Sequence, residues 1–455
     1  MLNLKKIAIF AAAVMLAACH QDSIEETPAS ETSSSTVTTN YAARAATSGV
    51  LKALTYNVAG LPEGLSSSHP ATNTPFISTK IAPYDIIHVQ EDFNYHAALY
   101  ANDYHPYRTP TSGGAAVGSG LNTLSNYPYT DFQRIKWNSC NGTDCLTPKG
   151  FTFMRIRIDE GVYIDFYNAH PNAGTEDADL SARRSNISQI SQFITENSSG
   201  NAVVLMGDWN CRYTRAEDNI RTFTDANGLT DAWIKLVRNN NVPAAGTDAL
   251  LCDSPPTSNS CEVVDKIFYR SNNLVTITPS GYQLNDPTFV NSSGEPLSDH
   301  WPLFVNINWV INSTLQASDL FGGPHGTPFN DANSLSSSSA PASISIRAGS
   351  RIDQVSIKLT NGTTLAHGGT GGTLKTLTLS AGEYVDKVTL HEGQYSGHTR
   401  IFYIEFHTNL NHTLSGGTKT GDAVTYTTPT GWKLTGYYGN AGDAVDKLGL
   451  IYNPL

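Results

Sequence analysis

Apolar and polar positions alternate differently in two parts of the chain, and this predicts two domains. From Val50 to Trp309, short apolar runs are each followed by polar or glycine-rich residues. The run Val203–Met206 is apolar throughout, which predicts a strand buried on both faces, and we expect Gly207 to end it. A helix is expected at 180–195, where Leu180, Ile187, Ile190 and Ile194 fall on one face. Further strands are expected at 51–57, 86–91, 151–158, 162–170, 263–269 and 302–307.

Helical periodicity disappears after Trp309, and Gly, Thr and Ser become frequent around alternating strands. Strands are expected at 343–347, 354–359, 384–390 and 401–406. The pattern predicts a layered α/β sandwich with mixed sheets over residues 49–311, and a separate all-β domain over residues 316–455.

The first residues have the features of an export signal. Lys5 and Lys6 precede an apolar run too short to span a bilayer, which predicts a signal peptide over residues 1–18. Its end, Leu16-Ala-Ala-Cys19, resembles a bacterial lipobox, which implies lipidation of Cys19. An ordinary signal peptide with a chance cysteine is the alternative. Residues 19–48 are rich in Ser, Thr and Ala and predict a flexible tether.

The net charge of the chain bears on which partners it can bind. The net charge is −11, and removing residues 1–18, which hold two lysines and no acid, makes it −13. An acidic surface argues against affinity for nucleic acid, so no stable nucleic-acid partner is expected.

In an oxidising compartment, Cys140/Cys145 and Cys252/Cys261 are most simply two local disulfides, which leaves Cys211 unpaired. Other pairings remain possible, and the spacing fits no zinc site.

Polar side chains recur where the predicted strands of the first domain end. Each has an ordinary explanation by itself, as a surface acid, a satisfied histidine or a turn residue. Together they supply what metal-assisted phosphodiester hydrolysis needs: carboxylates that hold a hard cation, and imidazoles that move protons near neutral pH. The set comprises Asn57, Glu91, His170, Asp208, Asn210, Asp265, Asp299 and His300.

Six short motifs contain these residues: Thr55-Tyr-Asn57, Gln90-Glu91, Asn168-Ala-His170, Gly207-Asp208-Trp-Asn210, Val264-Asp265-Lys-Ile-Phe and Ser298-Asp299-His300-Trp-Pro. They occur in the order typical of the endonuclease/exonuclease/phosphatase superfamily, which the chain closely resembles from about Val50 to Trp309. The superfamily includes DNase I-like and sphingomyelinase-like hydrolases. The resemblance implies a four-layer α/β/β/α sandwich.

The resemblance also implies a role for each residue of this set. Glu91 would be the principal ligand of Mg²⁺ (or Mn²⁺ or Ca²⁺), with Asn57 and Asp299 completing the metal site. His300 would be the general base and Asp265 the carboxylate that orients it. His170 would contact the phosphate or serve the leaving group. Asp208 and Asn210 would grip the phosphate or a second metal.

Arg212 and Arg215 follow the motif Gly207-Asp208-Trp-Asn210, and they could bind a substrate phosphate through paired hydrogen bonds. A solvated arginine pair on a loop is an equal alternative.

Two glycine-rich segments lie near the ends of the second domain: Gly322-Gly-Pro-His-Gly326-Thr-Pro-Phe-Asn-Asp331 and Gly436-Tyr-Tyr-Gly439-Asn-Ala-Gly442-Asp-Ala-Val-Asp446-Lys-Leu-Gly449. At both segments the domain resembles jacalin-like lectins. The resemblance implies a β-prism, with sugar contacts at Gly326, at the backbone of Asp443 and Ala444, and at the Asp446 carboxylate. A prism retained only as a structural or protein-binding module is the alternative.

These observations favour a divalent-metal-dependent phosphodiester hydrolase directed to glycans by its lectin domain. We expect an exported bacterial lipoprotein, anchored through Cys19 at the outer membrane or cell surface and monomeric. An acidic chain with a membrane anchor favours a phospholipid or another surface phosphoester as substrate. A nonspecific secreted endonuclease is the alternative among enzymes. A glycan-binding adhesin with an inactive hydrolase domain is the alternative of another class.

Overall fold

The computed structural model describes residues 37–40, 46–66, 68–284 and 286–455. The predicted signal peptide, Cys19 and most of the tether lie outside these residues. Within the predicted tether, β1 (Val37–Asn40) pairs in parallel with β24 (Asp422–Thr427), so this stretch belongs to a sheet. Ser48, the predicted end of the tether, is the first residue of β2.

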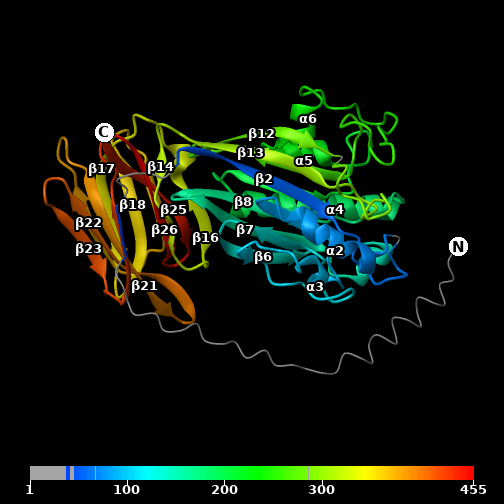
Figure 1. Ribbon diagram of the computed structural model, residues 1–455. Coiled ribbons are helices and arrows are strands. Elements are labelled where there is room, and N and C mark those ends of the chain that lie inside the picture. Colours follow the sequence, from blue (N-terminus) through cyan, green and yellow to red (C-terminus); the bar gives the residue numbers. More distant parts are fainter. Residues whose placement is uncertain (1–36, 41–45, 67, 285) are drawn as a thin grey trace. The chain divides into compact units, whose positions relative to one another are not determined.

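The first domain contains two six-stranded sheets, which carry the strands predicted from the apolar runs (Figure 1). One sheet has the order β12 (Val275–Gln283), β13 (Leu303–Ile311), β2 (Ser48–Asn57), β3 (Ile86–Gln90), β5 (Asn122–Ser125) and β4 (Tyr107–Arg108). The other has the order β10 (Thr230–Asp231), β11 (Asp265–Arg270), β9 (Val203–Asp208), β8 (Val162–Ala169), β7 (Gly150–Asp159) and β6 (Tyr129–Lys136).

Helices cover the outer faces of the two sheets. The predicted helix is α4 (Asp177–Asn197), whose Ile187, Ile190 and Ile194 pack with strand residues of the second sheet. On the first sheet, Ile77 and Ile81 of α2 (Pro70–Ile81) pack with residues of β2 and β3. The remaining helices are α3 (His96–Leu99), α5 (Ile220–Asn227) and α6 (Ala232–Leu236), with a 3-10 turn at Gly142–Leu146. The four-layer sandwich is confirmed.

The strand pairing brings distant parts of the sequence to one edge. In the first sheet β2 and β3 run in parallel with Asn57 opposite Gln90, and β13 enters antiparallel with Leu303 opposite Thr55. In the second sheet β9 and β11 are antiparallel, with Asp208 opposite Asp265. The ends of β2 and β3 therefore meet the start of β13 at one edge of the first sheet, and the end of β9 meets the start of β11 in the second sheet. Residues next to these strand ends are neighbours in space.

Gly207 does not end its strand, contrary to the expectation. β9 continues through Asp208, and every residue of it is buried. A Cβ at Gly207 would lie 2.1 Å from the carbonyl oxygen of Ala169 in the neighbouring strand β8. Glycine is therefore required here because two strand backbones approach each other closely.

The second domain is an all-β prism of three sheets, as predicted. The first sheet has the order β1, β24, β21 (Val385–Tyr395), β22 (His398–Thr408) and β23 (Thr413–Gly417). The second has the order β14 (Gln316–Ala317), β26 (Val445–Pro454), β25 (Trp432–Ala441) and β16 (Thr327–Asn330). The third has the order β19 (Thr364–Gly368), β18 (Ile352–Leu359), β17 (Pro341–Ala348) and β20 (Thr373–Thr378). The short strand β15 (Phe321–Gly322) pairs with β26, and a 3-10 turn spans Asp331–Ser334.

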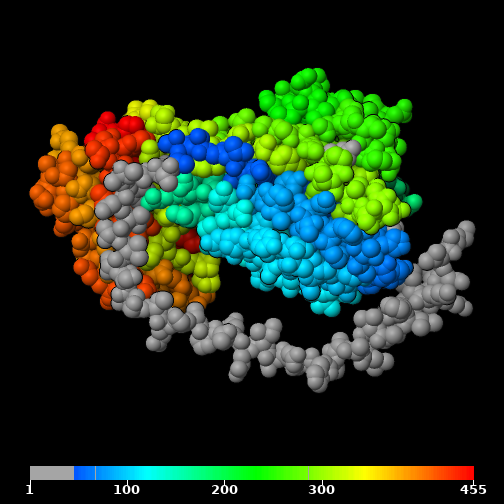
Figure 2. All heavy atoms as spheres, viewed as in Figure 1, coloured from blue at the N-terminus to red at the C-terminus, as the bar shows by residue number. Residues whose placement is uncertain are grey.

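Side chains fill the space between the ribbons of both domains (Figure 2). The described residues from Val37 onward belong to one compact unit, and ion pairs join the first domain to the second. The Arg157 guanidinium binds the Asp319 carboxylate with two contacts of 2.8 Å. Among the described residues, no helix has the length and apolar character that crossing a membrane requires.

Candidate active site

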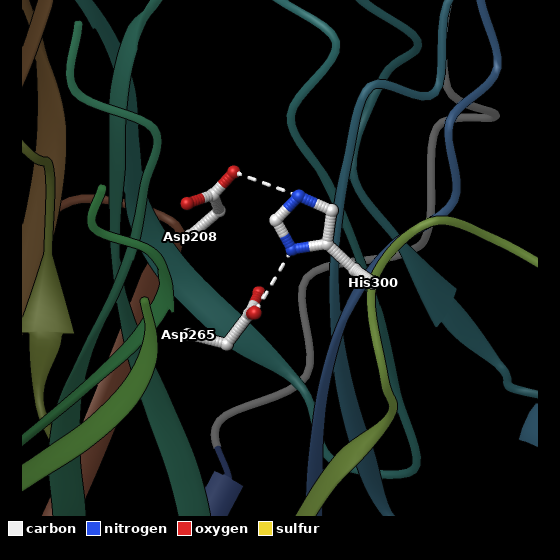
Figure 3. A group of neighbouring side chains, drawn as sticks. All are labelled: Asp208, Asp265 and His300. Carbon is white, nitrogen blue, oxygen red and sulfur yellow. Dashed lines mark hydrogen bonds and ion pairs between the residues drawn. The ribbon is translucent and has the colours of Figure 1, made fainter. Parts of the chain in front are cut away.

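His300 lies between two carboxylates at the shared edge of the sheets (Figure 3). Its Nδ1 is 2.9 Å from Asp265 Oδ2, and its Nε2 is 3.6 Å from Asp208 Oδ2. One donor atom from each of these three residues lies within 4.8 Å of the others. The register of β9 and β11 places the two acids opposite each other, so the arrangement follows directly from strand pairing.

The neighbouring carboxylates favour the protonated form of His300. Burial by itself would lower the pKa of His300, but the Asp265 and Asp208 carboxylates outweigh it and raise this pKa well above its usual value. Burial raises the pKa of Asp208, and the positive charge of His300 opposes that rise. Asp265 Oδ1 is buried and has no hydrogen-bond partner within the described ranges. The Asp265 carboxylate therefore holds the histidine by one oxygen, as an orienting group does.

Asn57 joins this group to Glu91. Its Nδ2 donates to Asp208 Oδ2 and to Glu91 Oε1, both at 3.2 Å. Glu91 has a φ of 58°, a left-handed conformation that costs energy in a residue with a side chain and is found often at functional sites. Asp299 is exposed, and its Oδ1 lies 3.3 Å from Ser298 Oγ, which also donates to the Asn57 carbonyl oxygen at 2.7 Å.

A second polar link joins the two sheets beneath the site. The Gln90 amide donates to Asn168 Oδ1 at 2.8 Å, and the Asn168 amide donates to the carbonyl oxygens of Val89 and Asn122. Gln90 and Asn168 belong to the motifs that carried the family resemblance. In the structure they hold the sheets in register rather than facing a substrate, since both are fully buried.

His170 lies behind Asp208, with 1% of its side chain exposed. Its Nε2 is 3.3 Å from Asp208 Oδ2 and 3.1 Å from Lys149 Nζ. Burial, and then the positive charge of Lys149, lower the pKa of His170 well below its usual value, so the imidazole is neutral. This burial separates His170 from the direct phosphate contact that the resemblance implies.

Sequence reasoning misses Lys149, which precedes β7. Its Nζ also pairs with Asp144 Oδ1 at 2.7 Å, and 11% of its side chain is exposed. Lys149 is the cation nearest His170, and it lies closer to solvent than the imidazole. The only signal in the sequence is a lysine directly before a predicted strand, which is too common to single out.

The two arginines predicted near the phosphate bind the protein itself. Arg212 Nη1 donates to the Glu262 carbonyl oxygen. Arg215 Nη1 donates to the Asn210 carbonyl oxygen at 3.0 Å and to Asp218 Oδ2 at 2.9 Å. These contacts favour a structural role over phosphate binding. They fix the loop after β9, in which Asn210 has a φ of 51° and donates through Nδ2 to the Pro171 carbonyl oxygen.

Glu262 anchors the same loop from the other side. Its buried carboxylate accepts hydrogen bonds from the Tyr213 backbone and from Thr214 Oγ1, the latter at 2.9 Å. Lys266 Nζ lies 3.4 Å from the same carboxylate. Glu262 therefore connects the loop after β9 to the segment that leads into Asp265.

The predicted cysteine pairing is confirmed. Cys140–Cys145 and Cys252–Cys261 are disulfides, and Cys211 is a buried free thiol. The first disulfide closes the loop that carries Asp144, the partner of Lys149. The second directly precedes Glu262.

The structure brings two of the predicted sugar contacts together in the β-prism. A Cβ at Gly326, whose φ is 78°, would lie 2.5 Å from Asp446 Oδ2. The Asp446 side chain is 2% exposed and lies 3.5 Å from Arg400 Nε. Asp443 is exposed and Ala444 is buried, on the turn that joins β25 to β26.

Fold and site together define an α/β sandwich that carries a histidine between two carboxylates, joined to a β-prism. Residues 71–255 match the Endonuclease/Exonuclease/phosphatase family 2, and residues 318–451 match the Jacalin-like lectin domain. The chain therefore joins a domain of the endonuclease/exonuclease/phosphatase family to a jacalin-like lectin domain.

Among curated proteins, the chain is similar to the sphingomyelinases of Mycobacterium tuberculosis and Mycobacterium bovis. Each is 37% identical over 275 residues, which is 58% of this chain and 54% of the relative. The chain spans about half the length of the curated relatives it matches.

Two solved structures are among those similar to parts of the chain. One is sphingomyelinase C from Streptomyces griseocarneus, with 20% identity and a TM-score of 0.40, over 57% of this chain and 99% of that one. The other is a mannose-binding jacalin-related lectin from Ananas comosus, with 24% identity and a TM-score of 0.28, over 31% of this chain and 99% of that one.

Proposed function

We propose that this protein is a divalent-metal-dependent phosphodiesterase that cleaves a sphingomyelin-type phospholipid. The observation that carries the proposal is the position of His300 between Asp265 and Asp208, with Asn57 linking Asp208 to Glu91. A histidine held by carboxylates beside a further acid is suited to activating water next to a bound cation.

The donor set around Glu91 fits a hard cation. Carboxylate oxygens from Glu91 and the exposed Asp299 match the preference of Mg²⁺ for oxygen ligands plus water, and Mn²⁺ or Ca²⁺ would accept the same donors. Asn57, expected from the resemblance to be a ligand, instead turns its Nδ2 toward Glu91, and its Oδ1 accepts a hydrogen bond from the Ala59 N–H at 3.0 Å. When bound, the cation neutralises phosphate charge and adds positive charge beside Asp208, which opposes the raised pKa of His300.

Each residue of the chain then has a defined task. Neutral His300 takes a proton from water through Nε2 as the water oxygen bonds to phosphorus, and Asp265 stabilises the imidazolium that forms. The bond from phosphorus to the ester oxygen breaks, and the leaving alcohol needs a proton. Lys149, whose Nζ lies 3.1 Å from His170 Nε2 and whose side chain is 11% exposed, is suited to this task.

Two observations support a phospholipid over nucleic acid. The relatives that match at 37% identity are named sphingomyelinases. The chain is also acidic overall, and Arg212 and Arg215 are engaged by the protein itself. A secreted endonuclease and an inactive adhesin remain the competing functions.

The proposal includes an exported, monomeric lipoprotein anchored through Cys19, with a prism that binds glycans at Gly326 and Asp446. The lipobox-like sequence before Cys19 supports the anchor. Metabolic labelling with a fatty acid tests it: wild type should incorporate label and Cys19→Ser should not. Equal labelling of both would contradict the anchor.

Hydrolysis assays test the enzyme. With Mg²⁺, the protein should hydrolyse bis-p-nitrophenyl phosphate, and EDTA or His300→Ala should abolish the activity. His69→Ala, which removes a histidine with 76% side-chain exposure, is the matched control and should keep it. Sphingomyelin vesicles and plasmid DNA offered side by side then decide the substrate. Cleavage of plasmid alone would establish the endonuclease, and no hydrolysis at all would favour the adhesin.

A further inference from the structure

Basic and aromatic side chains gather around the Asp446 carboxylate of the β-prism. We call this set, Arg351, Arg400, His325, His398 and Tyr395, the arginine–histidine cluster. The rings of His325 and His398 stack with centroids 3.7 Å apart. The guanidinium of Arg351 lies 4.3 Å from the centre of the Tyr395 ring, and that of Arg400 lies 5.9 Å from it. Segments from four parts of the prism thus converge on one carboxylate.

The polar atoms at the centre of the cluster are incompletely paired. Asp446 Oδ1, Arg400 Nε and Arg351 Nε are buried, and none has a hydrogen-bond partner in the part of the chain that the structure describes. The closest charge contacts are 3.5 Å, from Arg400 Nε to Asp446, and 3.9 Å, from Arg351 to Asp353. Both exceed an ordinary N–H···O distance. Buried donors and acceptors in native proteins nearly always have partners, so the geometry suits a ligand that brings acceptors to the arginines.

The unpaired N–H donors of Arg400 and Arg351 favour an anionic ligand. A guanidinium offers a planar set of N–H donors that matches a carboxylate or sulfate in paired hydrogen bonds, and such charge-assisted bonds are roughly twice as strong as neutral ones. Sugar hydroxyls would satisfy Asp446, which accepts only. The Nε–H of Arg400, whose contact with Asp446 is 3.5 Å long, would pair more strongly with a charged acceptor than with a hydroxyl. Tyr395, with 48% exposure, adds an apolar face on which a sugar ring can pack.

We propose that the β-prism site binds glycans that carry a carboxylate or sulfate group, and that Arg400 selects for this charge. The proposal rests on the proposed function, in which Asp446 binds sugar, and goes beyond it by naming the class of glycan. Arg351 and Tyr395 lie beside Arg400 and complete the wall that receives the charged group.

Binding of four oligosaccharides to the full chain, measured by titration calorimetry, tests the proposal. The probes are 3′-sialyllactose, lactose 3′-sulfate, and neutral lactose and mannotriose. We expect at least one charged probe to bind on the order of tenfold more tightly than both neutral probes, and added salt to weaken that preference. Arg400→Gln should abolish the preference. Arg400→Lys, which keeps the charge but loses the planar donors, should reduce it.

Lys358→Gln, on an exposed residue of β18, is the matched control for loss of a positive charge and should leave binding unchanged. Thermal unfolding of each variant reports whether it is folded. Neutral probes that bind as tightly as the charged ones, with no effect of Arg400→Gln, would overturn charge selection and leave the lectin function intact. Binding of no probe by the wild-type chain would overturn sugar binding itself, and the charge proposal with it.

Discussion

A buried histidine between the two sheets of the first domain should make the protein lose stability in mild acid. His88 lies in β3, with its ring 6.0 Å from that of Phe166 in β8, and it is 1% exposed. Neither ring nitrogen has a hydrogen-bond partner among the residues described. Burial lowers the pKa of His88 from 6.5 to about 3, and the nearby backbone of Met206 and Tyr167 offsets only part of this effect.

The size of the effect follows from linkage between protonation and folding. The pKa of His88 is depressed in the folded state, so the unfolded chain binds a proton near pH 6.5 whereas the folded chain binds it only near pH 3. Stability from this residue is therefore complete above pH 6.5 and falls as the pH drops toward 3. Between pH 8 and pH 5 the loss is about 2 kcal/mol, the difference in proton-binding free energy for these two pKa values.

Urea unfolding of wild type and His88→Leu at both pH values measures this loss. Leucine fills a similar volume without a titrating group, so the variant should lose about 2 kcal/mol less stability than wild type between pH 8 and pH 5. His69→Leu, at an exposed histidine, should lose as much as wild type. Equal losses in wild type and His88→Leu would refute the reasoning, because His88 would then titrate alike in both states.

Three further changes test the site and its support. Asp265→Asn removes one of the three carboxylate charges that raise the pKa of His300, so the pH–rate profile should shift to lower pH and kcat should fall about 10² to 10⁴-fold; an unchanged profile would count against the orienting role. Glu262→Gln weakens a buried carboxylate that accepts four hydrogen bonds, and should cost about 1–3 kcal/mol in urea unfolding, whereas full stability would show that the loop after β9 needs no such anchor. Gly207→Ala places a Cβ 2.1 Å from the Ala169 carbonyl oxygen and should lower stability by at least about 1–3 kcal/mol in thermal unfolding; an unaltered midpoint would mean that the strands separate freely.

Sequence patterns predict most of the fold, because an apolar run in the sequence and a buried strand in the structure both reflect the removal of apolar side chains from water. Val203–Met206 is apolar at every position and forms the central strand β9, buried throughout. Polar residues at strand ends also predict which side chains meet, since parallel ends share an edge. Asn57 and Asp208 are 151 positions apart in the chain and yet hydrogen-bond to each other.

Features that depend on tertiary contacts escape sequence reasoning. Lys149 is an ordinary lysine in sequence, and only the pairing of β7 with β8 brings it to His170. Gly207 looks like a strand end, but the nearness of Ala169 in β8 is what requires a glycine there. The residues 37–40 have no strong apolar pattern, and their strand forms because the edge of β24 offers backbone partners.

The central claim is that acids and amides from separate strand ends form one pocket that holds a divalent cation beside His300. Anomalous scattering from crystals soaked in Mn²⁺ tests it most directly. We predict a peak within bonding distance of the Glu91 carboxylate, on the side that faces Asp208 and His300, and its loss in Glu91→Gln. Absence of any peak near Glu91 in the wild-type protein, or a peak that persists unchanged in Glu91→Gln, would contradict the account.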